Sequence, residues 1–460
     1  MKFNVYHRFI LTYILLIIFE NAIKDFLFFI TPSANYLLRD IFSMFCVVIT
    51  FLMLFRSASF TYNKNEKFLL IFIAINSLFI PIYSGFLAYI NYGQDILYGF
   101  LAERGRLVSI SIIILYYALK QKKITLFQIH EIIIKLSWIC LIIYLSYRML
   151  YSITPGIFAT SEEDAIKGLS MFDIRTIETK GSITMRVSQA FLVYAIITYF
   201  INYINKRKLK DIFKLLAFFL FIVIFIKSRG IIVFVGMTLI LAYWQTAKIK
   251  GKMISAVLFC ILALTFIYSN SILENDSSPS FISSFVNIIN GIGEAKKGNI
   301  SPENMEASTW ARFYSLDIVF TSFSQNPANW IFGTGRLSNQ YNGGAQKQIG
   351  EYFYPEDIGI PGAIFLYGII ILALFKIVYL FIYKNLKLPD NPIYIQAMRF
   401  FVLYLFINSI QTGSDIMGSP ELLLVFFAFS IHCHILNRLI KGKKVKDFYS
   451  TSEKSNIIIH

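Results

Sequence analysis

The sequence predicts an all-α polytopic membrane protein with about twelve transmembrane helices and one large extracytoplasmic loop that contains short helices. Three observations lead to this fold class. Hydrophobic residues make up 56% of the 460 residues, which excludes an ordinary soluble protein. Apolar runs of roughly 20 residues, the length of a bilayer-crossing helix, recur along the chain. Lysines and arginines gather in short clusters between these runs, the pattern that orients membrane proteins.

The apolar runs are long enough to cross the hydrocarbon core of a bilayer as helices. In chain order, they predict spans at residues 9–30, 36–55, 67–90, 98–119, 132–152, 184–204, 211–227, 230–247, 252–269, 358–383, 394–412 and 419–438. The seventh and eighth spans are short and meet at Lys227-Ser228-Arg229-Gly230, so they form a tight hairpin or broken helices. Lys2 and Arg8 precede the first run without a convincing cleavage site, which predicts an uncleaved first helix.

The net charge of +16 reflects membrane topology rather than a nucleic-acid partner, because the basic residues lie in short clusters between apolar runs. These clusters, such as Lys120, Lys122 and Lys123, occupy alternate connections between the spans. By the positive-inside rule the basic connections and both termini are cytoplasmic. The sequence therefore predicts a multi-pass membrane protein with both termini in the cytoplasm.

Four regions follow from this topology: helices one to nine over residues 1–269, the large extracytoplasmic loop over 270–357, helices ten to twelve over 358–440, and a basic cytoplasmic tail over 441–460. In the large loop, apolar residues at helical spacing predict an amphipathic helix from Phe281 to Ile292 on the membrane face. They also predict a second helix from Trp310 to Phe323 that ends before Asn326-Pro327. The 153–183 connection is expected to be a solvated connector or lid.

The spacing of cysteines and histidines does not indicate a metal or a disulfide. Cys46, Cys140, Cys260 and Cys433 lie far apart, in or at the end of apolar segments, and are expected to be buried thiols. The tract His432-Cys433-His434 lies at one helix end with too few ligands for zinc. Nothing resembles a P-loop, a dinucleotide fingerprint or a Ser-His-Asp set, so neither a metal nor another cofactor is expected.

Arginines occur near the predicted outer ends of helices, where positive-inside sorting disfavours them. The set comprises Arg104 and Arg106 at the start of the fourth span, Arg148 near the end of the fifth, Arg186 at the start of the sixth, Arg229 with Lys227 at the hairpin, and Arg312 and Arg336 in the large loop. They are functional candidates, or they snorkel to headgroups or pair with Asp95, Glu103 and Asp317. Arginine's planar fork suits a lipid-linked pyrophosphate, both as bound group and as leaving group.

A transfer to a sugar hydroxyl also needs a general base, usually a carboxylate or a histidine. All five histidines are predicted at cytoplasmic ends or tails, so none is available on the outer face. Glu356 and Asp357 are the carboxylates best placed for this role, at the membrane boundary under the large loop. The alternative is that they are an acidic pair that stabilises a helix start through the helix dipole.

Three motifs support a family resemblance: Ser228-Arg229-Gly230 between apolar segments, the run from Trp310-Ala311-Arg312 through Asn326-Pro327 to Gly333-Thr334-Gly335, and the carboxylate pair followed by Ile358-Gly359-Ile360-Pro361-Gly362. By these motifs, over roughly residues 212–385, and by its topology, the chain resembles the Wzy-type O-antigen and capsule polymerases of the O-antigen ligase and polymerase superfamily. The resemblance implies a GT-C-like enzyme of the bacterial cytoplasmic (inner) membrane that acts on undecaprenyl-pyrophosphate glycans without a metal or nucleotide. It assigns Arg229 and Arg312 to the donor pyrophosphate.

The expected function is therefore polymerisation of lipid-linked repeat units, with one lipid-linked chain as donor and a hydroxyl on a second unit as acceptor. Glu356 or Asp357 is the expected base, and Arg104, Arg106, Arg186, Lys227 and Arg336 are expected to line the same mouth. Membrane lipid and a chain-length regulator are the other partners that the resemblance implies. A lipid-linked oligosaccharide flippase and an O-antigen ligase stay open as alternatives. The long outer loop argues against a flippase, and a carboxylate pair where ligases typically carry histidine argues against a ligase.

Overall fold

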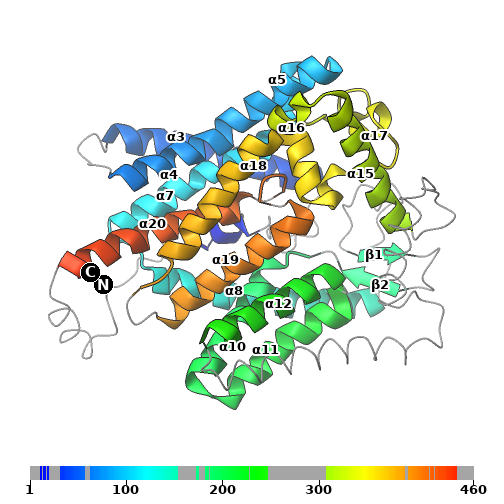
Figure 1. The fold of residues 1–460 in the computed structure, drawn as a ribbon. Helices are drawn as coiled ribbons and strands as arrows, with labels where there is room; N and C mark the ends of the chain where they lie inside the picture. The colour runs from blue at the N-terminus through cyan, green and yellow to red at the C-terminus, as the bar shows by residue number, and fades with distance from the viewer. Residues whose placement is uncertain are drawn as a thin grey trace.

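The computed structural model shows a bundle of helices (Figure 1). It describes residues 11–12, 14–16, 18–19, 32–56, 63–153, 172–175, 182–185, 187–226, 228–246, 307–388, 392–413, 415–418 and 420–442. Among these residues, five helices are long and apolar enough to cross a membrane: Lys64–Tyr92, Leu126–Ile153, Ile360–Asn385, Ile393–Thr412 and Pro420–Leu439. They coincide with five of the predicted spans, so the prediction of a helical membrane protein is confirmed at this level.

The first part of the bundle consists of helices linked by short turns. They are α3 (Pro32–Arg56), α4 (Lys64–Ala74), the π-helical turn η1 (Ile75–Phe79), α5 (Ile80–Tyr92), α6 (Ile96–Glu103), the 3₁₀ turn η2 (Arg104–Ile110), α7 (Ser111–Lys120) and α8 (Leu126–Ile153). A capping box starts α4, because Asn63 and Glu66 each accept the other's backbone amide. The π-helical turn comes just before Pro81, whose missing amide donor removes one helical hydrogen bond.

The fourth predicted span, 98–119, is not one continuous helix, so that prediction is wrong in detail. Helix α6 ends at Glu103, the 3₁₀ turn η2 follows, and α7 begins at Ser111. A short 3₁₀ stretch inside an apolar helix often marks a functional or strained position. In this case the break accompanies a buried side chain, because Arg106 in η2 is only 4% exposed.

The middle of the chain combines a small β-ribbon with three helices. Strand β1 (Phe172–Arg175) pairs antiparallel with β2 (Ser182–Met185), and α10 (Ala190–Lys206), α11 (Leu209–Phe221), the π-helical turn η4 (Ile222–Ile226) and α12 (Arg229–Thr246) follow. The predicted span 184–204 therefore begins as a strand and becomes helical only at Ala190. The span predicted at 252–269 and the amphipathic helix predicted at 281–292 lie outside the described residues.

The last part of the chain carries the described half of the large loop and the final three spans. Its elements are α15 (Ala307–Gln325), α16 (Ala328–Phe332), α17 (Gly344–Gln348), the 3₁₀ turn η6 (Pro355–Ile358), α18 (Ile360–Asn385), α19 (Ile393–Thr412) and α20 (Pro420–Gly442). Helix α15 confirms the predicted helix from Trp310 to Phe323 and its stop before Asn326-Pro327. Helices α15 to α17 lie together at one end of the bundle (Figure 1).

The core is rich in aromatic side chains. Phe191 on α10 stacks on Phe19 with ring centroids 4.6 Å apart, and Tyr194 meets Phe401 of α19 edge to face at 5.3 Å. Such pairs stabilise by about 0.5–1.5 kcal/mol beyond area burial. On α3, by contrast, Phe45 is 61% exposed, which suits a helix face that contacts lipid.

Candidate functional site

Helix α18 is broken near its middle, and a segment of the large loop fills the break. Gly368 has φ 79° and ψ 164°, outside the helical region, so nearby carbonyls lose their helical donors. Thr334 donates its amide to the carbonyl of Phe365 at 2.7 Å, and Gly335 donates to that of Leu366 at 3.0 Å. Unwound backbone inside a membrane bundle must be satisfied by its neighbours in this way.

The turn Gly333-Thr334-Gly335 fits between α5 and α18 because two of its residues have no side chain. Gly335 has φ 84°, and a Cβ there would lie 2.3 Å from the carbonyl oxygen of Ser84. Gly333 has φ 82°, and a Cβ there would lie 2.7 Å from the amide nitrogen of Gly368. Glycine alone adopts these left-handed conformations at such close approach without strain. The turn therefore delivers the following residue, Arg336, to the interior of the bundle.

Side chains of α5 and its C-terminal turn fix the backbone of Arg336 on both sides. The Ser84 hydroxyl accepts a hydrogen bond from the backbone amide of Arg336 at 2.9 Å. The buried Gln94 side chain donates to the Arg336 carbonyl at 3.1 Å and accepts the Ser338 amide at 2.7 Å. These contacts tie the large loop to a membrane-spanning helix, so the position of the arginine is set by packing.

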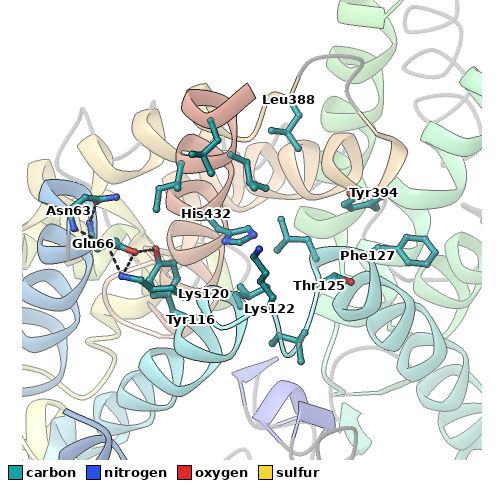
Figure 2. A pocket seen from close by; sticks show the side chains of 16 residues that line it. Asn63, Glu66, Tyr116, Lys120, Lys122, Thr125, Phe127, Leu388, Tyr394 and His432 are labelled. Carbon is teal, nitrogen blue, oxygen red and sulfur yellow. Dashed lines mark hydrogen bonds and ion pairs between the residues drawn. The ribbon is translucent and has the colours of Figure 1, made fainter. Parts of the chain in front are cut away.

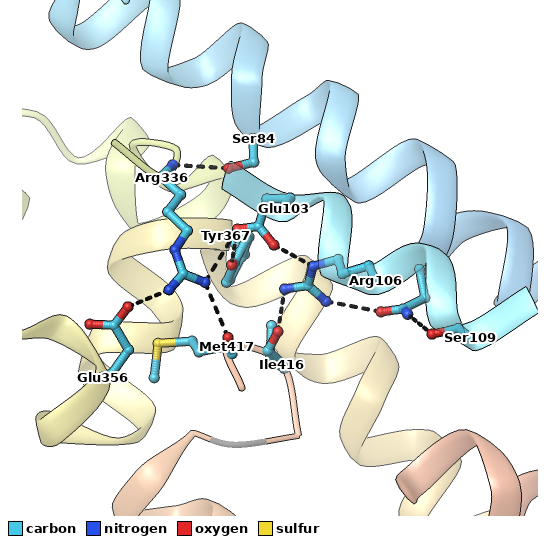
Figure 3. Close-up of polar contacts among 10 residues, drawn as sticks. Ser84, Glu103, Arg106, Ser109, Arg336, Glu356, Tyr367, Ile416 and Met417 are labelled. Carbon is cyan, nitrogen blue, oxygen red and sulfur yellow. Dashed lines mark hydrogen bonds and ion pairs between the residues drawn. The ribbon is translucent and has the colours of Figure 1, made fainter. Parts of the chain in front are cut away.

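The Arg336 guanidinium contacts acceptors from three separate parts of the chain (Figure 3). It donates to Glu356 at 2.7 Å and to the carbonyl of Met417 at 3.2 Å, and it lies 3.7 Å from the carboxylate of Glu103. Its side chain is 28% exposed and that of Glu356 is 43% exposed, so this edge of the cluster is accessible. Burial acts to lower the pKa of Arg336, but Glu356 and Glu103 outweigh it and raise the pKa. Arg336 therefore stays charged.

Glu103 links this cluster to a second arginine deeper in the bundle (Figure 3). The Glu103 carboxylate is 2% exposed. It accepts hydrogen bonds from Nε of Arg106 and from the Tyr367 hydroxyl, each at 2.5 Å. Arg106 also donates to the Asn76 side chain at 2.9 Å and to the carbonyl of Ile416. A buried charge is tolerated when it is paired and hydrogen-bonded in this manner. We call Glu103, Arg106, Arg336, Glu356 and Tyr367 the arginine–carboxylate cluster.

A second non-helical segment, 415–418 between α19 and α20, supplies the two carbonyls that the arginines contact. Its first residue, Asp415, is buried, and its carboxylate lies 2.7 Å from the ammonium of Lys376 on α18. The Lys376 ammonium also donates to Ser409 at 2.7 Å. Non-helical backbone within membrane bundles occurs where it is buried in protein or lines a cavity, and ligand sites form at such places.

Turn η6 presents the two candidate bases in different surroundings. Glu356 is engaged by Arg336, whereas Asp357 is exposed at the surface. Partial burial of its carboxyl raises the pKa of Asp357; Arg312 acts to lower it and Glu356 to raise it further, and the net pKa is above the ordinary value. Asp357 is therefore a stronger base than an ordinary aspartate.

Helix α15 holds Arg312 near this carboxylate. The Ser315 hydroxyl accepts the amide of Tyr354 at 3.0 Å and donates to the carbonyl of Tyr352 at 3.3 Å, which fixes α15 against the segment that leads into η6. Arg312 is exposed, and its charge acts on Asp357. The predicted residues Arg312, Glu356 and Asp357 are thus brought together with Arg336.

The other predicted arginines divide into three cases. Arg104 forms an ion pair with Asp40 of α3 at 2.9 Å, a carboxylate that the sequence had not indicated as a partner, and this pair does not join the cluster. Arg229 is the first residue of α12. The adjacent Gly230 packs against Gln411 at the end of α19, and a Cβ added to Gly230 would lie 3.0 Å from the side-chain oxygen of Gln411. Gln411 also packs against Gly359 beside η6, so the backbone of Arg229 starts at this same end. Arg186 and Lys227 lie outside the described residues.

Sequence reasoning missed Tyr367, Lys376 and Asp415, and it treated Glu103 only as a pairing partner. Glu103 and Lys376 carried a usable signal, because ionisable residues inside apolar spans are rare and mostly functional or paired. Tyr367 carried none, since tyrosine is common in these spans. Its role follows only from the contact with Glu103, which lies far away in the sequence.

Within the described residues, no group of three or more His, Cys, Asp or Glu side chains is arranged to hold a metal ion. Comparison of the chain with protein-family models, curated proteins and solved structures found no match. The site consists of a partly exposed arginine fork, an exposed arginine and a carboxylate of raised pKa. Such a set can bind a multiply charged anion and accept a proton beside it.

Proposed function

We propose that this chain is an inverting polysaccharide polymerase of the Wzy type in the bacterial cytoplasmic membrane, with both termini in the cytoplasm. The observation that supports this most is the grouping of Arg336, Arg312 and Asp357 at one end of a helical bundle. A lipid-linked pyrophosphate keeps its tail in the bilayer and presents its charge at such an end. Fixed positive charge there stabilises both the bound donor and the leaving group.

Arg336 and Arg312 are the proposed ligands of the donor pyrophosphate. Arg336 has a planar fork that is already oriented by Glu356 and by Met417. Arg106 is a positioning residue in this proposal, because it is 4% exposed and its donors are occupied. The assignment of Arg229, Arg186 and Lys227 to the same mouth stays a prediction.

The proposed reaction is a single displacement at the anomeric carbon of the donor sugar. The acceptor hydroxyl oxygen forms a bond to that carbon, and the bond from the carbon to the pyrophosphate oxygen breaks with its electron pair on the pyrophosphate. The hydroxyl proton passes to Asp357, whose raised pKa suits a general base. Glu356 holds Arg336 and is a positioning residue.

A lipid-linked oligosaccharide flippase is a second candidate, which one observation favours. The Lys376–Asp415 pair lies beside the broken helix α18, and charged pairs and broken helices also line transport paths. The helices α15 to α17 of the large loop favour the polymerase, because most loops of a flippase are expected to be short.

Deletion of the gene in its host, followed by complementation, tests the proposal. Surface glycolipids are separated on a gel from strains that carry wild type, Arg312→Ala or Asp357→Asn, with equal protein levels in membranes. Loss of the ladder, with a single repeat unit on the acceptor, in the deletion and in both variants supports a polymerase. Long chains that accumulate on the lipid carrier indicate a ligase instead, and single units trapped on the cytoplasmic side indicate a flippase.

A further inference from the structure

A cavity of about 480 Å³ lies at the helix ends remote from η6, because η6 precedes the start of α18 and the cavity includes Leu388 beyond its end. Figure 2 shows the side chains that line it. It is bounded by the starts of α4, α8 and α19 and by the ends of α7 and α20. These are the helix ends at which the basic connections predict the cytoplasmic face. The cavity is therefore separate from the arginine–carboxylate cluster and takes no part in the proposed reaction.

The lining combines an apolar wall with a few cationic and polar groups. Leu126, Leu388 and Leu436 contribute to the wall. Glu66 contributes a carboxylate to this lining. It forms an ion pair with Lys120 at 3.0 Å and accepts a hydrogen bond from the Tyr116 hydroxyl at 2.8 Å. Its charge is thus compensated inside the cavity wall.

Lys122 is the second lysine of the lining, and unlike Lys120 it is not paired with Glu66. It adopts φ 57°, a left-handed conformation that L side chains rarely take, in the turn that ends α7. Figure 2 shows its side chain extending toward the ring of His432. Among the described residues, no carboxylate forms an ion pair with the Lys122 ammonium. An anion that entered the cavity would therefore meet an available charge, with the Thr125 side chain also in the lining.

The rim of the cavity is apolar as well as basic. Phe127 is 53% exposed and Leu439 is 56% exposed, and both line the cavity. Exposed apolar side chains at a mouth favour a ligand that has a hydrocarbon part, whereas a free inorganic anion gains nothing from them. Anionic phospholipids of the cytoplasmic leaflet combine both chemistries at this depth of a membrane.

We propose that this cavity binds an anionic phospholipid, with its phosphate on Lys122 and Thr125 and an acyl chain along Leu126, Leu436 and Leu439. The ligand class follows from the ammonium of Lys122, which has no carboxylate partner among the described residues and lines a cavity with a largely apolar wall and rim. Charge-assisted hydrogen bonds to phosphate supply the specificity, and burial of the chain supplies further affinity.

The test uses the full chain purified in a neutral detergent, with thermal unfolding followed as phosphatidylglycerol, phosphatidylcholine or inorganic phosphate is added. The wild type should be stabilised by phosphatidylglycerol and much less by the other two, because binding to the folded state raises the melting temperature. Lys122→Glu should weaken the apparent affinity for phosphatidylglycerol about tenfold or more. Lys123→Glu is the matched control, since Lys123 is exposed, adjacent and outside the lining, and it should bind as the wild type does.

Leu436→Trp provides a second variant that fills the apolar wall without changing the charge, and it should also weaken phosphatidylglycerol binding. Equal loss in Lys122→Glu and Lys123→Glu overturns the site, because it shows attraction to the whole basic end. No stabilisation of the wild type by phosphatidylglycerol overturns it too. If inorganic phosphate alone reproduces the shift and Lys122→Glu removes it, the anion site is supported and the lipid is overturned as its source.

Discussion

The guanidinium of Arg336 lies 3.7 Å from the carboxylate of Glu103, although one belongs to the large loop and the other is the last residue of helix α6. Because Glu103 is 2% exposed and also paired with Arg106, the loop shares a buried electrostatic unit with the bundle. A substitution at Arg336 in the loop therefore changes the electrostatic surroundings of Glu103 inside the bundle. The reverse also holds, since Glu103 helps to set where the arginine fork points.

Replacement of Arg336 with methionine should destabilise the protein by about 2 kcal/mol, because it removes charge-assisted hydrogen bonds from a network that is buried at Glu103 and accessible at Glu356. Glu356 loses its partner, and Glu103 keeps only one of its two arginines. Thermal unfolding in detergent measures the effect. Arg312→Met is the control, and as an exposed change it should alter stability by less than about 0.5 kcal/mol. Equal melting temperatures for the two variants would contradict the structural role of Arg336.

Gly335→Ala should destabilise the fold by about 2 kcal/mol or more. The new Cβ would lie 2.3 Å from the Ser84 carbonyl oxygen, at a φ of 84° that alanine adopts only under strain. Gly236→Ala in α12 is the matched control, because nothing lies within 4 Å of a Cβ there. Replacement of a helical glycine by alanine in open space should increase the stability of the protein by up to about 1 kcal/mol. Similar melting temperatures for both variants would show that the turn does not pack as described.

The sequence predicted the elements that depend on local pattern. Length and apolarity located the spans at 67–90 and 394–412, and the spacing of apolar residues located the helix from Trp310 to Phe323. The stop before Asn326-Pro327 also followed locally, because proline disfavours helical geometry at the residue before it. The structure places Arg336 2.7 Å from Glu356 and lets the charge of Arg312 act on Asp357, and the sequence had assigned all four residues to the same loop.

The broken elements could not be predicted in this way, because long-range contacts decide them. Residues 98–119 have the composition of one apolar helix, yet α6 ends at Glu103, where the carboxylate meets Arg106 and Tyr367. The non-helical conformation at Gly368 likewise depends on a turn from elsewhere in the chain, whose amides bond the freed carbonyls. The β-ribbon before α10 was hidden because its second strand continues directly into an apolar run.

Asp357→Asn should abolish or reduce transfer about 100-fold or more, the usual scale for loss of a general base, while the protein still folds. Glu356→Gln should reduce transfer less, since it removes an ion pair with Arg336 rather than the base. Polymer formation from purified lipid-linked units in proteoliposomes measures both. A fully active Asp357→Asn variant would remove this residue from the mechanism.

The pH profile gives a separate test of the same carboxylate. A base acts when deprotonated, so activity should fall as pH drops through the pKa of Asp357, which burial raises above the ordinary value. Arg312 lowers that pKa, and therefore the acid limb of the residual activity that Arg312→Ala retains with purified lipid-linked units should lie at higher pH than in the wild type. Arg104→Ala is the control, because Arg104 pairs with Asp40 and should leave the limb in place. A limb that moves to lower pH in Arg312→Ala would contradict the assignment.

The Lys376–Asp415 pair predicts a strong coupling between two otherwise distant segments. Asp415→Leu should leave the Lys376 ammonium without its carboxylate, and Lys376→Met should leave the buried carboxylate without its ammonium. Each single change should destabilise by about 3–5 kcal/mol, because one charge of a buried pair is left alone. The double variant Lys376→Met, Asp415→Leu removes both charges and should recover much of that loss, since apolar replacement of a whole buried pair is often nearly neutral. Melting temperatures of the four proteins form a double-mutant cycle, and additive losses would show that the pair is not coupled.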